Sequence, residues 1–186
     1  MKSSTKNATK KLVLSSLMAA LICVATALIK VPLPVLGYIH LGDAPVILAA
    51  FLLSPTYGFL AAAIGSCLAD VFSGYAVYAP VTFLIKGCMV LVVFGVMRLL
   101  GKRCKPLVAQ ILAGALAEVL MIFGYWLFEG IMYGFGAALA AVPFNAVQGV
   151  VGLTLGLLSL HVLRRSGALR SFEIFDTEKG TEDEKR

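Results

Sequence analysis

Long apolar runs recur along this chain of 186 residues from Leu12 to Leu163, and they limit its possible folds more than any single motif does. A helix needs about 20 apolar residues to cross a bilayer. Here 60% of the residues are hydrophobic and 14% are charged, whereas soluble domains are about half apolar and about a quarter charged. The sequence therefore predicts an all-α membrane protein with several transmembrane helices.

The apolar runs divide into six predicted transmembrane helices, at residues 11–31, 41–54, 56–75, 79–100, 106–128 and 138–163. These helices form one membrane domain over 11–165, with a tail at 1–10 and a polar tail at 166–186. The second run is short, and Pro55 with Gly58 predicts a tight turn after it. A short run of this kind is tolerated where neighbouring protein satisfies its backbone.

The basic residues predict how these helices are oriented. All but two of the 16 lysines and arginines lie in the first eleven residues, in 98–105 or after residue 163. With six spans these three regions share one side of the membrane, and the positive-inside rule makes that side cytoplasmic. Membrane topology thus explains the net charge of +6, and we expect no nucleic-acid partner.

Polar side chains inside the apolar runs form a second pattern. At a rise of about 1.5 Å per helical residue, they all fall in the outer half of the bilayer or near its middle. Burying one charge there costs about 3 kcal/mol. A shared depth therefore favours a polar pocket open to the outside, and we expect substrate contacts from Asp70, Lys86, Glu118, Asn145 and Gln148.

Structural roles remain open for several of these groups. Asp70 and Lys86 could form an ion pair between their helices, or Lys86 could extend to the outer interface. Asp43 could simply cap the second helix, whose N-terminus favours a negative side chain. Asn145 and Gln148 share one helix face and could join helices instead of contacting a ligand.

Aromatic residues gather toward the predicted outer ends of the helices. Tyrosine and tryptophan are common at membrane interfaces, and this explains most of them (Tyr38, Tyr125, Trp126 and Tyr133). Tyr75 and Tyr78 flank the charged stretch, so we expect them to stack on a flat ligand ring. Glu129 lies at the outer boundary, where we expect it to be exposed to solvent.

Small residues recur every three or four positions in three of the predicted helices. Such stripes let helices approach closely, and those in the third and sixth helices are expected to serve internal packing (Gly58, Ala62, Ser66; Gly149, Gly152, Gly156). The first helix has two offset pairs, Ser15 with Ala19 and Ser16 with Ala20, with few polar groups around them. We expect this stripe to dock a partner protein.

Three motifs stand close together between residues 36 and 87. They are LGDAPVILAAFLLSP, a glycine- and alanine-rich run ending in LAD, and YAPVTFLIKG. This region resembles the substrate-binding S components of energy-coupling factor (ECF) vitamin transporters. The chain length and the six-helix organisation are also similar to those of the family.

The resemblance implies a multi-pass protein of the bacterial plasma membrane that captures a vitamin or precursor from outside. An S component assembles with a transmembrane T component and two cytoplasmic ABC ATPases, which drive uptake. The family's first helix often docks the T component through AxxxA, which is SxxxA here. The pattern resembles that of members for riboflavin, hydroxymethylpyrimidine or pyridoxine, and the sequence does not choose among these ligands.

A stand-alone carrier coupled to protons through Asp70 or Glu118 is the alternative function. An enzyme is not favoured, because His40 and His161 fall at opposite sides of the membrane and the chain contains no HExxH or Ser-His arrangement. The chain also has no Walker motif, so any ATP hydrolysis belongs to partner subunits. We expect no metal or cofactor, since the four cysteines lack CxxC spacing.

Overall fold

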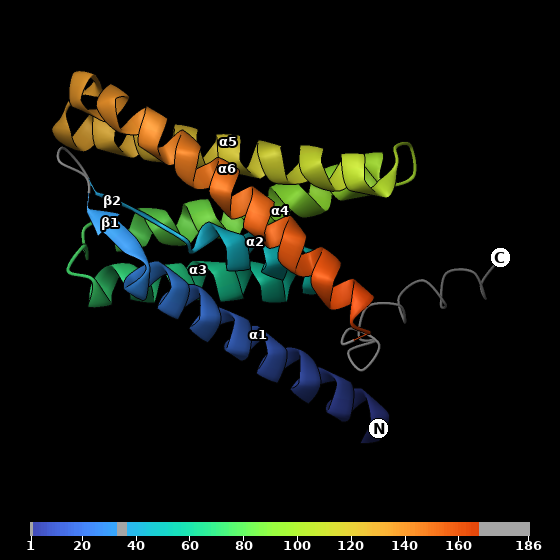
Figure 1. The fold of residues 1–186 in the computed structure, drawn as a ribbon. Coiled ribbons are helices and arrows are strands. Elements are labelled where there is room, and N and C mark those ends of the chain that lie inside the picture. Colours follow the sequence, from blue (N-terminus) through green and yellow to red (C-terminus); the bar gives the residue numbers. More distant parts are fainter. Residues whose placement is uncertain (1, 33–36, 168–186) are drawn as a thin grey trace.

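The computed structural model describes residues 2–32 and 37–167, and it consists of six helices and one short two-stranded sheet (Figure 1). In chain order these elements are α1 (Lys2–Leu28), β1 (Lys30–Pro32), β2 (Tyr38–His40), α2 (Asp43–Leu52), α3 (Pro55–Phe72), α4 (Ala79–Leu100), α5 (Pro106–Tyr133) and α6 (Phe135–Arg165). The strands are antiparallel, with Lys30 opposite His40. The all-α fold class is confirmed.

Several helix ends differ from the predicted ones. α1 ends at Leu28 instead of residue 31, because Lys30–Pro32 pairs with Tyr38–His40 as a strand. α5 and α6 are separated only by Gly134, whose φ of 94° suits glycine, so α5 continues past its predicted end at 128. The predicted polar tail lies almost wholly outside the described residues.

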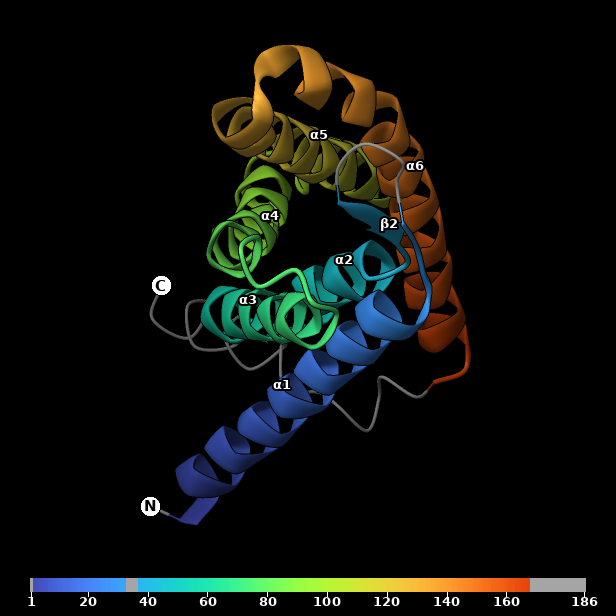
Figure 2. The same cartoon turned by 90° about the vertical axis from the view of Figure 1, so that its left-hand side faces the viewer.

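Within the described part of the chain, five helices are long and apolar enough to cross a membrane. The sixth, α2, has 10 residues and lies inside the bundle, where it packs against α1, α3, α4 and α6 (Figure 2). Neighbouring protein thus surrounds its backbone, as a short helix at membrane depth requires.

The small residues allow close contacts between helices. A Cβ atom on Gly152 of α6 would lie 2.5 Å from the Cβ of Asp43 on α2, and one on Gly65 of α3 would lie 2.5 Å from the backbone oxygen of Ala19 on α1. With a larger residue at Gly152 or Gly65, α6 could not lie so close to α2, nor α3 so close to α1. These stripes serve internal packing, as the sequence predicts.

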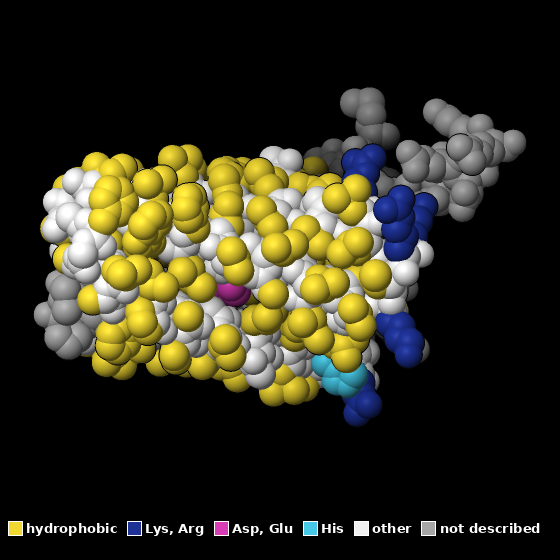
Figure 3. Space-filling model, turned by 90° about the horizontal axis from the view of Figure 1, so that it is seen from above, with side chains coloured by type: hydrophobic (Ala, Val, Ile, Leu, Met, Phe, Trp, Pro, Cys, Tyr) yellow, Lys and Arg dark blue, Asp and Glu magenta, His cyan; other side chains and the backbone are white. Residues whose placement is uncertain are grey.

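The surface carries a wide apolar belt. On the face in Figure 3, hydrophobic side chains cover most of the bundle, and the lysines and arginines gather at one end. The start of α1 and the end of α6 lie toward this same end in Figure 1. A multi-pass membrane protein has this distribution of side chains.

Candidate functional site

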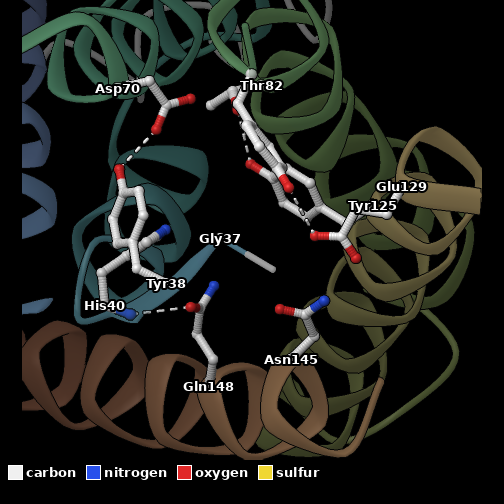
Figure 4. Close-up of a pocket in the computed structure, with 10 residues that line it drawn as sticks. Gly37, Tyr38, His40, Asp70, Thr82, Tyr125, Glu129, Asn145 and Gln148 are labelled. Atoms are coloured by element: carbon white, nitrogen blue, oxygen red, sulfur yellow. Dashed lines mark hydrogen bonds between the residues drawn. The ribbon is translucent and has the colours of Figure 1, made fainter. Parts of the chain in front are cut away.

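A polar cavity lies at the end of the bundle that holds β2, away from the start of α1 and the end of α6 (Figure 1), and Figure 4 shows its lining. The segment before α2 and the helices α3, α4, α5 and α6 all contribute to it. Ten residues line it: Gly37, Tyr38, His40, Asp70, Tyr78, Thr82, Tyr125, Glu129, Asn145 and Gln148. The labelled side chains of this lining surround a common open space in Figure 4.

Asp70, near the end of α3, is one of two acids in this lining, and it is only 4% exposed. The Tyr38 hydroxyl donates a hydrogen bond of 2.6 Å to its Oδ1. Burial and the charge of Asp70 raise the pKa of Tyr38, so its hydroxyl remains a neutral donor. Within the described residues the Asp70 Oδ2 atom has no hydrogen-bond partner, although the Thr82 side chain lies nearby.

Glu129 of α5 is the second acid, and it is 3% exposed. The Tyr78 hydroxyl donates to its Oε1 over 3.3 Å, while Oε2 has no partner in the described part of the chain. Gly37, with a φ of 63°, passes beside this pair. The expectation that Glu129 is exposed to solvent was wrong, because α5 extends beyond residue 128 and turns this side chain inward.

His40 joins the lining through β2. Its backbone N–H donates to Gln148 Oε1 over 2.9 Å, and the Gly42 N–H donates to its ring Nδ1 over 3.1 Å. The neutral ring must then carry its proton on Nε2. Burial lowers the pKa of His40 to about 4, against the opposing charge of Asp43 and with a smaller contribution from Lys86. The ring is therefore neutral at physiological pH.

A charged network lies next to the cavity. The Lys86 ammonium forms an ion pair with Asp43 Oδ1, and Gln148 Nε2 donates to Asp43 Oδ2 over 2.7 Å. Lys86 and Asp43 are both fully buried. Gln148 connects this network to the cavity, because its Oε1 accepts from His40.

This network corrects three of the structural alternatives. Lys86 pairs with Asp43 and not with Asp70, and it does not extend to the outer interface. Asp43 also does more than cap a helix, since it accepts from Lys86 and Gln148. The physical reason is the position of α2 inside the bundle, which directs its first turn toward α4 and α6.

Some of the predicted substrate-binding residues line the cavity and the others lie outside it. Asp70, Tyr78, Asn145 and Gln148 line the cavity, whereas Lys86 belongs to the adjacent network. Tyr75 does not line it and packs on the Tyr38 ring, with 4.6 Å between centroids. Glu118 is buried beside Gly149, also outside the lining, and neither of its carboxylate oxygens has a hydrogen-bond partner among the described residues.

Comparison with known proteins identifies the family. The model of the family "ECF-type riboflavin transporter, S component" matches residues 6–165. The chain belongs to this family. As a member of a transporter S-component family, it is not an enzyme of its own.

Two curated proteins and one solved structure are similar to this S component. An uncharacterised Pyrococcus woesei protein is 33% identical over 136 residues, which cover 73% of this chain and 88% of that protein. The thiamine precursor transporter HmpT of Lactococcus lactis subsp. cremoris (strain MG1363) is 27% identical over 165 residues, or 88% and 93% of the two chains. A bacterial ECF transporter S component shares the fold, with a TM-score of 0.69, 23% identity and coverage of 84% and 96%.

The four predicted docking residues of this S component lie together. Ser15, Ser16, Ala19 and Ala20 line a largely apolar groove between α1 and α3. Ser15 is buried, and its hydroxyl donates to the backbone oxygen of Tyr57 over 3.0 Å. Ser16 and Ala20 are exposed, so they are the members of the stripe that a partner can reach.

Sequence reasoning missed part of the lining. His40, Gly37 and Thr82 gave no signal, because nothing in their spacing links them to the buried acids. Tyr38 and Tyr125 were assigned to the membrane interface. Here the Tyr125 hydroxyl lies 3.0 Å from that of Thr82 in a buried pair.

Proposed function

We propose that this S component captures a water-soluble vitamin or vitamin precursor from outside the cell, in the cavity lined by Asp70, Glu129 and Asn145. The observation that carries the proposal is a set of buried polar atoms without partners inside an apolar bundle, Asp70 Oδ2 and Glu129 Oε2 among them. Buried polar groups without hydrogen bonds are costly and uncommon. A bound ligand would supply the missing partners.

The lining suits a small polar ring. The acids accept hydrogen bonds, the amides of Asn145 and Gln148 can donate or accept, and Tyr38 and Tyr78 offer aromatic surface. Lys86 and Asp43 hold Gln148 in place from the other side. In this proposal Tyr75 supports Tyr38 and does not itself stack on the ligand, and Glu118 lies outside the first contacts.

Transport would depend on partner proteins. We propose that a T component docks on the α1–α3 groove through Ser16 and Ala20, and that two ABC ATPases complete the transporter. The chain then lies in the plasma membrane of a bacterium, with both termini in the cytoplasm. The similarity to a thiamine precursor transporter supports a vitamin or precursor as the cargo.

A proton-coupled carrier is the second candidate, because Glu118 has no hydrogen-bond partner in the described interior. Uptake assays separate the two functions. Cells with this chain alone and cells that also express a T component and both ATPases are given a labelled vitamin. The proposal expects uptake only with the full set and loss of uptake when an ATPase is inactivated. Uptake by the chain alone that stops when the proton gradient is dissipated would support the carrier instead.

A further inference from the structure

A second groove opens on the apolar surface of the bundle, between the end of α1, the two strands and the middle of α6. We call it the lateral groove. Most of its lining is aliphatic, with Leu28 and Ile29 on one wall and Val147 and Val151 of α6 on the other. All four side chains are exposed. In a membrane protein such side chains face the acyl chains of the lipid, which are as apolar as leucine.

One cation lies in this apolar lining. Lys30, the first residue of β1, is half-buried, and the pairing of its backbone with His40 fixes its place in the groove. Its ammonium lies 5.5 Å from the centroid of the Tyr38 ring and forms no ion pair with any described residue. Asp70 is close enough to attract it but is hydrogen-bonded by Tyr38. The ammonium therefore has donors available for an external anion.

The cation and the aliphatic wall of α6 lie at different depths. Lys30 follows the end of α1, at the end of the bundle where α6 begins (Figure 1). Val147 and Val151 lie about three and four turns along α6 from Phe135. In a bilayer the first position is at the level of the headgroups and the second is within the hydrocarbon core. The phosphate and one acyl chain of a single phospholipid therefore match the two parts of the groove.

The charge of Lys30 is unusual for this end of the molecule. Apart from Lys86, which Asp43 binds, every other lysine and arginine lies in the first eleven residues, in 98–105 or after residue 163. A zwitterionic phospholipid carries its own ammonium beside the phosphate. An anionic phospholipid has no such group, so Lys30 serves as its counter-ion. The groove therefore favours the anionic class.

We propose that the lateral groove binds one anionic phospholipid, with its phosphate at Lys30 and an acyl chain along Val147 and Val151. In the orientation proposed above, this lipid belongs to the outer leaflet. The lateral groove and the polar cavity share His40 and Gln148, which are joined by a hydrogen bond (Figure 4). The lipid thus lies against a wall of the cavity from the membrane side. The site does not depend on which ligand the cavity takes.

Quenching of tryptophan fluorescence by brominated phospholipids tests this site in the full-length protein. The chain has one tryptophan, Trp126, which lies in a separate apolar groove. Trp126→Phe combined with Val147→Trp therefore reports from the lateral groove alone. The protein is reconstituted with equal amounts of phosphatidylglycerol and phosphatidylethanolamine, and either one or the other is brominated on its acyl chains. We expect phosphatidylglycerol to be preferred about fivefold in the groove, as one lysine near an anionic lipid produces.

Charge variants and a second reporter provide the controls. Lys30→Gln should remove the preference, whereas Lys102→Gln, in the basic cluster after α4, should leave it unchanged. The wild-type protein, which reports from Trp126, should show no preference, because the described residues that line that groove include no lysine or arginine. Leu28→Trp in place of Val147→Trp repeats the measurement from the opposite wall, and thermal unfolding checks that each variant folds.

Two results would overturn the proposal. The first is equal quenching by both lipids at both reporter positions, or a preference that survives Lys30→Gln. The second is a reporter that neither brominated lipid quenches, because a protein surface, such as a second copy of this chain, then covers the groove instead of a lipid.

Discussion

At the scale of single residues, the most consequential feature is the buried ion pair of Lys86 and Asp43. Removing one member of a buried pair leaves an uncompensated charge and costs about 3–5 kcal/mol, whereas replacing both by neutral groups of similar size costs far less. The pair also holds Gln148 at the cavity wall. The stability of the fold and the shape of the cavity are therefore linked at this point.

Lys86→Met should lower the thermal stability of the detergent-purified protein markedly, because Asp43 then stays buried without its cation. Adding Asp43→Asn to this variant should restore much of the loss. Unfolding temperatures of the wild type, both single variants and the double variant give the coupling between the two sites. Strictly additive losses would contradict the ion pair.

The His40 ring predicts a pH dependence of stability. Its pKa in the folded protein is lowered to about 4, while the unfolded chain has the ordinary value of about 6.5. Between these values the unfolded state binds the proton more readily, so the free energy of unfolding falls as the pH drops from about 6.5 toward 4. His40→Gln should lose less stability than the wild type between pH 7 and pH 5. If the wild type and the variant lose the same free energy of unfolding between pH 7 and pH 5, the fold does not hold His40 in its neutral form.

The sequence identified several residues of the site but not which side chains they contact. A polar residue within an apolar run is easily recognised in the sequence, and that pattern identified Asp70, Asn145 and Gln148. The pattern could not show that Lys86 pairs with Asp43, because the pairing depends on how α2 and α4 are rotated about their axes. His40 was missed for the same kind of reason, since it enters the cavity only through the register of β1 with β2.

At the scale of elements, α6 crosses α2 at a distance that only glycine permits. A Cβ at Gly152 would meet the Cβ of Asp43 at 2.5 Å and the backbone nitrogen of Ala44 at 3.4 Å. Neither atom is the end of a flexible side chain, so the helices themselves would have to separate. The same crossing carries Asp43 and Gln148, and spreading it would disturb the charged network.

Gly152→Ala should therefore reduce stability by about 1–3 kcal/mol, as overpacking does, and should weaken ligand binding as well. Gly95→Ala in α4 is the matched control, because a Cβ there meets nothing within 4 Å. It should leave stability unchanged or slightly higher. The unfolding temperatures of both variants are compared with that of the wild type. An equal loss of stability in the two variants would contradict the close contact between α6 and α2.

The groove between α1 and α3 gives a second prediction at this scale. Ser16→Trp places a large side chain in the groove and should prevent co-purification with a T component, while ligand binding by the S component alone persists. Leu17→Trp is the control, since Leu17 is 64% exposed and does not line the groove. If the Ser16 variant assembles as well as the control, the T component docks elsewhere.

At the scale of the whole molecule, the sequence predicted the architecture well. Apolar runs of adequate length place the long helices, and the short second run indicates the enclosed α2. The ends of α1 and α5 were less predictable, because β1 with β2 and the single-residue turn at Gly134 leave no clear change in hydropathy. The family then connects this architecture to S components.

We propose that the cavity beside α2 holds a vitamin or vitamin precursor. Native mass spectrometry of the detergent-purified protein from cells grown in rich medium tests it most directly, with Asp70→Ala as the comparison. We expect a bound molecule of vitamin or precursor mass on the wild-type protein, and its loss or strong reduction on the folded variant. A wild-type protein that carries no such molecule and acquires none from a vitamin mixture would contradict ligand binding in this cavity.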